Sequence, residues 1–255
     1  MITNIQLFSE GGQGLIFKTN STYATKVGMN NDIMTEYTNI QRLPINLGCF
    51  YDISLVQIDS LHQEEIDYLL KYYDKTILVS YAINHNQTNE MSKLYMPFIE
   101  HPTFEKCIVK KYQCYKSEYR HNASLDIIVL NHWVNICKAM IELYNTVCEL
   151  NNTYKLFHND LSSCNILYDE NQNKFYIIDF GMMSFDTDRR DDGYKEDMLS
   201  IAQLMTYMLN IGIANSNILQ QLLTYIEFDT IYTAIISYGT KFEDIYNIIK
   251  PCLVC

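Results

Sequence analysis

The order of hydrophobic and polar positions divides the chain into a strand-rich part and a helical part. Up to about residue 100, short apolar runs alternate with polar turns that contain Gly, Asn or Pro, a pattern typical of β-strands. One longer segment, residues 31–43, predicts a helix that ends at Pro44. We therefore expect a small antiparallel sheet that carries this helix on one face. The expected strands are residues 5–9, 14–18, 21–27, 76–83 and 93–99.

Beyond residue 100 the hydrophobic period becomes that of helices. Residues 129–150 carry one apolar stripe at three- and four-residue steps, and residues 195–211 form a second amphipathic segment. Two strand-like runs, 164–169 and 174–180, lie between these helices, and shorter helices are expected within 216–250. The whole pattern predicts an α+β protein. The residues of the first stripe are Trp133, Ile136, Met140, Leu143 and Val147.

Composition and charge exclude several classes of protein. Apolar residues make up 48% of the 255 residues, enough to bury a large core. The net charge of −11 repels nucleic-acid backbones and anionic membranes, and the locally basic segment 106–122 is expected to be a solvated surface. The eight cysteines lack zinc-site spacing, and the chain shows neither a secretory signal nor a membrane-spanning run. We expect a cytoplasmic protein that binds no nucleic acid.

The segment HNDLSSCN, residues 158–165, contains the first candidate chemistry. Asp160 and Asn165 are five positions apart, and Leu161 between them can anchor the loop. Fourteen residues after Asn165, Asp179 follows an apolar strand in IIDFG. Transfer of a phosphoryl group needs a carboxylate to orient the acceptor hydroxyl and oxygen ligands for Mg²⁺ beside the phosphates. An Asp and an Asn at this spacing are common, but together with the downstream DFG they indicate phosphoryl transfer.

These segments resemble the eukaryotic-type protein kinase superfamily. The resemblance implies a two-lobed fold, with an N-lobe over 1–97, a C-lobe over 98–255, and ATP and Mg²⁺ as cofactors. It also implies that Asp160 is the catalytic base and that Asn165 and Asp179 hold the metal ions. The family's H-R-D-L-x-x-x-N is matched by His158, Asn159, Asp160, Leu161 and Asn165, and its D-F-G by Asp179, Phe180 and Gly181.

The segment SEGGQGLIFK resembles the glycine-rich loop of that family. Ser9 stands in the first glycine place, and Ile16 is the apolar residue expected above the adenine. Glycines suit this loop because backbone N–H groups must approach the phosphates without a Cβ in the way. A plain hairpin turn would explain the same residues. The glycines expected to contact the nucleotide are Gly11, Gly12 and Gly14.

Two further segments match the family in order. YATKV resembles V-A-I-K, which implies that Lys26 binds the α- and β-phosphates, that Ala24 contacts adenine, and that Glu36 in the next helix pairs with Lys26. LYMPFI resembles the hinge, with Met96 as gatekeeper and the backbone of Pro97 and Ile99 reading the adenine edge.

Each of these residues also has a plain structural explanation. A lysine in a strand or a glutamate on a helix is usually solvated, and His158 fits a core histidine better than a proton carrier. In the second long helical segment, residues 195–211, Asp197 matches the carboxylate that holds the catalytic-loop backbone, although an acid at a helix N-terminus is also common.

The sequence departs from the family at three places. Asn159 replaces the Arg of H-R-D, so regulation by a phosphorylated activation loop is not expected. Ser162 replaces the Lys of serine/threonine kinases. Asp197 lies only 18 positions after Asp179, and no A-P-E lies between them. This brevity resembles the compact kinases of the tRNA-modification complex, the lipopolysaccharide-type kinases and the aminoglycoside phosphotransferases.

The sequence therefore predicts an ATP- and Mg²⁺-dependent serine/threonine protein kinase. Two alternatives stay open: a kinase of small molecules or lipid headgroups, and an ATP-binding pseudokinase that acts as a scaffold. Arg189 and Arg190 could meet an acidic substrate, but a solvated pair among aspartates explains them better. The terminal CLVC has the C-a-a-X form, yet without a basic segment upstream we do not expect Cys252 to be prenylated. The compact pattern also resembles kinases of large DNA viruses and intracellular pathogens, which would act in the host cytoplasm.

Overall fold

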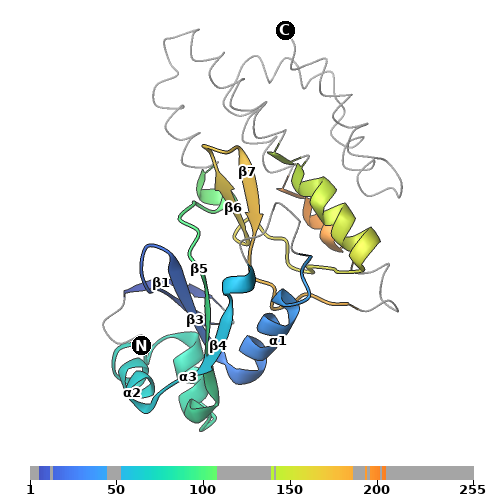
Figure 1. The fold of residues 1–255 in the computed structure, drawn as a ribbon. Helices are drawn as coiled ribbons and strands as arrows, with labels where there is room; N and C mark the ends of the chain where they lie inside the picture. The colour runs from blue at the N-terminus through green and yellow to red at the C-terminus, as the bar shows by residue number, and fades with distance from the viewer. Residues whose placement is uncertain are drawn as a thin grey trace, which may run out of the picture. The chain divides into compact units, whose positions relative to one another are not determined.

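The computed structural model describes residues 6–11, 14–44, 53–107, 139–140, 142–185, 193, 196–201 and 203–204 (Figure 1). These residues form two compact units. The first contains the described residues up to Glu100 and also Asp179–Met182, while the second contains His101–Ile178 and the described residues from Met183 onward. The chain therefore enters the first unit twice, the second time for only four residues.

The first unit is built on a five-stranded sheet in the order β1-β2-β3-β5-β4 (Figure 1). Every neighbouring pair is antiparallel, as the sequence predicts. The central strand β3 pairs with β2 on one side and with β5 on the other, so its side chains alternate between two covered faces. The strands are β1 (Leu7–Gly11), β2 (Gly14–Lys18), β3 (Tyr23–Met29), β4 (Gln57–Ser60) and β5 (Met91–Pro97).

Helix α1 (Asn30–Ile40) follows β3 without an intervening loop and contacts β3, β4 and β5. It buries Ile33 and Ile40 together with two polar side chains, Glu36 and Asn39. Glu36 bonds to Lys26 of β3, which places α1 on the Lys26 face of the sheet. The helix expected at 31–43 is thus present, and its last turn ends at residue 40, ahead of a turn that leads to Pro44.

Two more helices, α2 (Gln63–Tyr72) and α3 (Ile77–Asn84), cover the opposite face. Their apolar side chains form one cluster with side chains of β2, β3 and β5, and the sheet face involved is that of Val27. Figure 1 shows both helices beside β3 and β5. The members from the sheet are Leu15, Phe17, Val27 and Met91, and those from the helices are Ile66, Leu69, Leu78, Val79 and Ala82.

The strand expected at 76–83 is wrong, because these residues form α3. Its apolar run is continuous, and a continuous run of this length fits a buried strand as well as a buried helix. The buried positions Leu78, Val79 and Ala82 have helical spacing, while Ile77 and Tyr81 are exposed. Helix α2 and the edge strand β4 were not expected. β4 has mainly exposed polar residues, so no hydrophobic period marks it.

A buried ion pair joins α2 to the sheet. Lys93 Nζ of β5 lies 2.7 Å from Glu65 Oε2, and both side chains are almost completely buried. The same carboxylate oxygen accepts the backbone N–H of His62 at the start of α2, so Glu65 caps the helix as well. Asp59 of β4, half exposed, lies 3.5 Å from Lys93. Because burying a charge without a partner is costly, this pair fixes α2 against β5.

The second unit combines helical segments with a hairpin of β6 (Ile166–Asp169) and β7 (Lys174–Ile177). These strands lie within the two runs that the sequence predicts. Residues 142–149 are helical and continue into a π-helical turn, Leu150–Tyr154, and residues 196–201 and 203–204 are also helical. Their predicted apolar stripes are buried wherever the structure describes them. The buried residues are Met140, Leu143 and Val147 in the first segment and Met198, Ile201 and Leu204 in the second.

Several expectations fall on residues outside the described part. These are the helices expected within 216–250, most of the basic segment 106–122, the stripe residues Trp133 and Ile136, and the residues Gly12, Arg189, Arg190 and Cys252. The α+β class and the antiparallel sheet are confirmed. Within the described residues, no helix has the length and apolarity needed to cross a membrane.

The buried ion pair of Lys93 and Glu65 leads to a prediction about the stability of the fold. Among the described residues, replacing Glu65 by Gln leaves the buried Lys93 ammonium with the half-exposed Asp59 as its remaining carboxylate neighbour. We expect Glu65→Gln to lower the free energy of unfolding by about 3 kcal/mol. The double variant Lys93→Met with Glu65→Gln should recover part of that loss, because it removes the unpaired charge. Urea unfolding followed by circular dichroism measures both.

The matched control is the surface pair between Lys18 and Glu100, whose atoms are 2.8 Å apart. Lys18→Met should change the free energy of unfolding by less than about 1 kcal/mol, since exposed pairs contribute little. Equal losses in Glu65→Gln and Lys18→Met would contradict a structural role for the buried pair.

Candidate functional site

The predicted phosphate-binding lysine lies in the interior of the first unit. Lys26 occupies the middle of β3, opposite Ile16 of β2 and Leu94 of β5, and only 5% of its surface is exposed. Its neighbours Thr25 and Val27 point to the other face and are buried as well. A lysine in such a place needs carboxylate partners, which excludes the explanation of Lys26 as a solvated strand residue.

Two carboxylates supply those partners. Lys26 Nζ donates to Glu36 Oε2 of α1 at 2.7 Å and to Asp179 Oδ1 at 3.1 Å. The pair expected between Lys26 and Glu36 is therefore present, and Asp179 joins it from 153 positions away in the sequence. Glu36 is buried, whereas the Asp179 side chain is 33% exposed. One end of the group is thus closed and the other faces solvent.

Helix α1 also holds the peptide group that follows Asp179. Asn39 Nδ2 donates to the carbonyl oxygen of Phe180 at 2.7 Å, and Glu36 has a backbone hydrogen bond with Phe180. Phe180 is completely buried. Asp179 itself has a φ of 63°, in the left-handed region that non-glycine residues rarely adopt. The structure therefore maintains an unfavourable backbone at this aspartate, as often happens at functional residues.

Charge and burial act against each other in this group. Burial alone would lower the pKa of Lys26, but the carboxylates of Glu36 and Asp179 outweigh it and raise that pKa above its ordinary value. Burial raises the pKa of Glu36, and the positive charge of Lys26 opposes this rise. Lys26 is consequently an ammonium ion at neutral pH, with three N–H donors. Two of these donors point at Glu36 and Asp179.

The turn between β1 and β2 contains the predicted glycine-rich loop. Gly11 ends β1 and pairs with Gly14, which begins β2, while Gly12 lies outside the described residues. A Cβ on Gly14 would lie 2.5 Å from the carbonyl oxygen of Val27, so β2 and β3 can approach this closely only with glycine there. This contact explains Gly14 without a phosphate. Contact of Gly11 and Gly14 with a nucleotide stays a prediction.

The residues expected around adenine lie on adjacent strands. Ala24 of β3 is buried and sits directly opposite Met96 of β5, and Tyr23 is opposite Pro97. Ile16 is half-buried on β2, and Met96, Pro97 and Ile99 are half-buried at and just beyond the end of β5. The sheet thus brings Ala24 and Met96 together, as the resemblance implies, while their contact with adenine stays a prediction.

In the second unit, Asp160 and Asn165 are in direct contact. Asn165 Nδ2 donates to Asp160 Oδ2 at 2.8 Å and to the Asp160 carbonyl oxygen at 3.0 Å. A turn closes the loop between them, with the N–H of Ser162 donating to the Asp160 carbonyl oxygen. Asp160 is exposed. The carboxylate of Asp160 is therefore oriented by an amide, and the amide oxygen of Asn165 takes no part in these two bonds.

His158 joins this loop to the end of β7. Its Nδ1 accepts the N–H of Asp160 at 3.3 Å, and its Nε2 lies 3.2 Å from the carbonyl oxygen of Ile178. Because a backbone N–H only donates and a carbonyl only accepts, the ring is neutral with its hydrogen on Nε2. His158 is 99% buried, so it acts as a structural residue, as its sequence context favours.

Asp197 holds the backbone of the same loop. Its two carboxylate oxygens accept the N–H groups of His158 and Asn159 at 2.9 and 2.8 Å. With its amide nitrogen turned toward the carboxylate, Asn151 donates to Asp197 at 3.1 Å and to the Leu156 carbonyl oxygen at 2.6 Å. This is the arrangement that the resemblance implies for Asp197. Burial raises the pKa of Asp197 to about 6, although the two backbone N–H groups favour its ionised form.

Asn159 has a role that the sequence does not reveal. Its φ is 62°, a left-handed conformation that Asn tolerates better than most residues. Its Nδ2 donates to Ser184 Oγ at 3.0 Å and to the Phe157 carbonyl oxygen at 3.3 Å. Phe157 and Ser184 also exchange two backbone hydrogen bonds, of 3.0 and 2.9 Å. The residue in the Arg position of H-R-D therefore ties the loop to the segment after D-F-G through neutral bonds.

The structure thus assembles the expected residues into two groups. Lys26, Glu36 and Asp179 meet in the first unit, and Asp160 and Asn165 meet in the second. The expected Mg²⁺ ligands, Asn165 and Asp179, belong to different units. Among the described residues no group of three or more His, Cys, Asp or Glu is arranged as a metal site. The predicted ligand pair contains an Asn and is of another kind, so its role stays a prediction.

No protein-family model matches the chain, and the search of curated proteins finds no match either.

The raised pKa of Asp197 leads to a prediction about how the free energy of unfolding depends on pH. Because its folded-state value of about 6 lies above its ordinary value of 3.8, this carboxyl adds stability at low pH that is lost as the pH rises through 6. The stability of the wild type relative to Asp197→Asn should therefore fall by about 3 kcal/mol between low and neutral pH, at about 1.4 kcal/mol per pKa unit. Urea unfolding of both proteins across this range measures it.

All other titrating groups are common to the two proteins, so they cancel in the difference. A difference that is independent of pH would show that Asp197 has an ordinary pKa in the folded protein.

Proposed function

We propose that this protein is an ATP- and Mg²⁺-dependent phosphotransferase with the two-lobed kinase fold, and that it acts on hydroxyl groups of proteins. The observation that carries the proposal is the buried ammonium of Lys26 held by Glu36 and Asp179. The structural pair of Lys93 and Glu65 also has a second carboxylate nearby, but that residue, Asp59, lies on the adjacent strand β4. At Lys26 the second carboxylate approaches from a strained and partly exposed position.

The residues present fit a nucleoside triphosphate with a divalent cation. Two of the three N–H donors of Lys26 are directed at carboxylates, and the third can serve a phosphate oxygen. The Asp179 carboxylate and the Asn165 amide offer the oxygen ligands that Mg²⁺ prefers. When bound, the cation would neutralise phosphate charge. Ala24, buried opposite Met96, offers an apolar surface for a base.

Asp160 supports the part of the proposal that concerns phosphoryl transfer. It is exposed, so an acceptor hydroxyl can reach it, and Asn165 orients one of its oxygens. A carboxylate placed in this way can accept the proton of the attacking hydroxyl. The loop that carries it is held by the neutral ring of His158 and by the Asp197 carboxylate, so the position of Asp160 is fixed before substrate binds.

A kinase of small molecules or lipid headgroups is the second candidate. It is favoured by the short segment of 17 residues between Asp179 and Asp197, which leaves little chain for a peptide-binding platform, and by Ser162 in the place of a lysine. A scaffold that binds ATP without turnover is the third candidate, motivated by Asn159 and Ser9. The Lys26 group and the pairing of Asp160 with Asn165 speak against the scaffold, because binding alone needs no oriented carboxylate.

Transfer of labelled γ-phosphate tests the proposal. We expect the protein to label itself or proteins of an extract, and Asp160→Asn to lower the rate by about 10²- to 10⁴-fold, the usual contribution of a general base. Because Asp160 is exposed, this variant should keep its fold and its stabilisation by ATP with Mg²⁺ in a thermal-shift assay. Lys26→Met should lose that stabilisation. Asp67→Asn, an exposed carboxylate of α2, is the matched control and should change neither.

Parallel reactions with a protein extract and a metabolite extract separate the candidates. Labelling confined to metabolites would assign the second candidate, and stabilisation by ATP without any transfer would assign the third. Equal rates for Asp160→Asn and the wild type would overturn the assignment of Asp160 as the base.

A further inference from the structure

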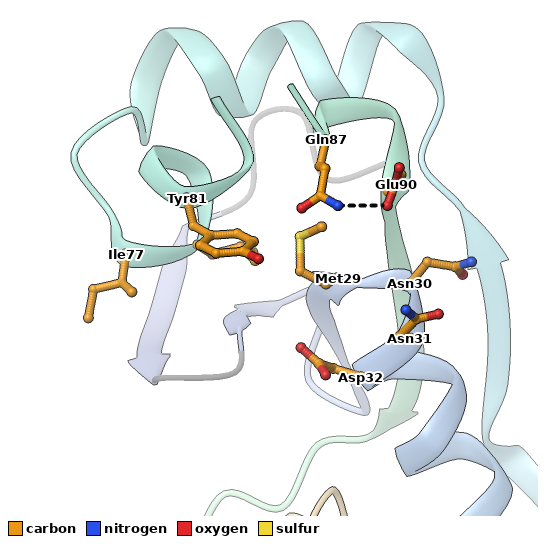
Figure 2. A pocket seen from close by; sticks show the side chains of 9 residues that line it. Met29, Asn30, Asn31, Asp32, Ile77, Tyr81, Gln87 and Glu90 are labelled. Carbon is orange, nitrogen blue, oxygen red and sulfur yellow. Dashed lines mark hydrogen bonds between the residues drawn. The ribbon is translucent and has the colours of Figure 1, made fainter. Parts of the chain in front are cut away.

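A hollow of about 420 Å³ lies in the first unit, away from the residues assigned to the nucleotide (Figure 2). It is formed by the junction of β3 with α1, by the exposed side of α3 and by the 3₁₀ turn η2 (Thr88–Glu90). A volume of this size accommodates a small ligand or one large side chain with its neighbours. The residues that line it are Met29, Asn30, Asn31, Asp32, Ile77, Leu78, Tyr81, Gln87 and Glu90.

Part of the lining is apolar and exposed. Ile77 is 65% exposed and Tyr81 is 47% exposed, although both are large hydrophobic residues of α3. Figure 2 shows Tyr81 and Met29 in the middle of the lining. The buried side of α3 already packs on the sheet through Leu78, Val79 and Ala82. The exposed side of the helix is therefore not required for the core, and a second contact would cover it.

The polar part of the lining is acidic. Asp32 and Glu90 supply two carboxylates from opposite sides of the hollow, and its described lining contains no Lys, Arg or His (Figure 2). Gln87 Nε2 donates to Glu90 Oε2 at 3.2 Å and so orients this carboxylate. The helix dipole explains Asp32 in the first turn of α1, but it explains neither Glu90 nor the exposed Tyr81 of the same lining.

These features restrict the occupant. An anion would be repelled by both carboxylates, and a purely apolar group would remove them from water without a partner. A long cationic side chain satisfies both parts of the lining, because its alkyl stem can lie on Met29 and Tyr81 while its charge meets Asp32 and Glu90. Arginine suits the site better than lysine, since its planar head stacks on an aromatic ring and pairs with carboxylates.

We propose that this hollow binds an arginine-containing segment of a partner protein, with an apolar residue next to the arginine to cover Ile77. The chain's net charge of −11 favours encounter with a basic partner of this kind. The inference does not rest on the proposed phosphotransfer, because none of the lining residues belongs to the groups around Lys26 or Asp160.

Binding of short acetylated peptides tests the proposal. The probes are a set in which arginine is flanked by leucine or phenylalanine, and a matched set with neutral citrulline in place of arginine. Fluorescence anisotropy should show that at least one arginine peptide binds about tenfold more tightly than its citrulline partner, the effect of about 1.4 kcal/mol from the charge pairs. The double variant Asp32→Asn with Glu90→Gln should remove this preference, and Tyr81→Ala should weaken binding of both sets.

Glu64→Gln is the matched control, because Glu64 is an exposed carboxylate of α2 that does not line the hollow. It should leave the preference unchanged. Unchanged melting temperatures would show that the variants are folded. The proposal is overturned if the citrulline peptides bind equally well, if the double variant keeps the preference, or if no peptide of the set binds at about 1 mM. Binding of agmatine, a small guanidinium compound, without binding of any peptide would also overturn it, by assigning the hollow to a small cation.

Discussion

The buried ammonium group of Lys26 sets the conditions that the rest of the first unit meets. A charge at this depth is tolerated only with carboxylate partners, and the nearest one is Glu36 of α1, the helix that directly follows β3. That requirement fixes the rotation of α1 about its axis. The same helix then presents Asn39 to Phe180, so Asp179 and Phe180 are held by the helix and the lysine together. One buried charge thus determines where a four-residue segment from far along the chain packs in the first unit.

The loop around Asp160 in the second unit is held in a different way. Side chains of the protein itself accept hydrogen bonds from its backbone N–H groups. Asp197 accepts two of them and the ring of His158 accepts a third. Each of these side chains is buried, whereas Asp160, which they surround, is exposed. The position of the Asp160 carboxylate is therefore maintained by neighbours that solvent does not reach. This separation between rigid support and accessible group is what a role as general base would require.

The sequence predicts the parts of this structure that show a hydrophobic period or a recognisable spacing of functional residues. The strands around Lys26, the helix with Glu36 and the hairpin after Asn165 were expected because alternation and motif spacing agree there. α3 was mistaken for a strand because a continuous apolar run has no period, and β4 was missed because its residues are mostly polar and exposed. The bond between Asn159 and Ser184 could not be foreseen, since it depends on a left-handed backbone that one residue adopts in its folded context.

The helical segment between β4 and β5 limits which shortened forms of this fold are possible. The two strands are antiparallel neighbours, so a tight turn would be enough to join them, and α2 and α3 look like a dispensable addition. Yet Lys93 of β5 relies on Glu65 from that addition for its buried partner. The face of β5 that carries Lys93 is the Val27 face, which α2 and α3 cover. The helical segment that removes Lys93 from water therefore also supplies the carboxylate that this burial requires, so the segment cannot lose Glu65 and still cover Lys93 without a cost.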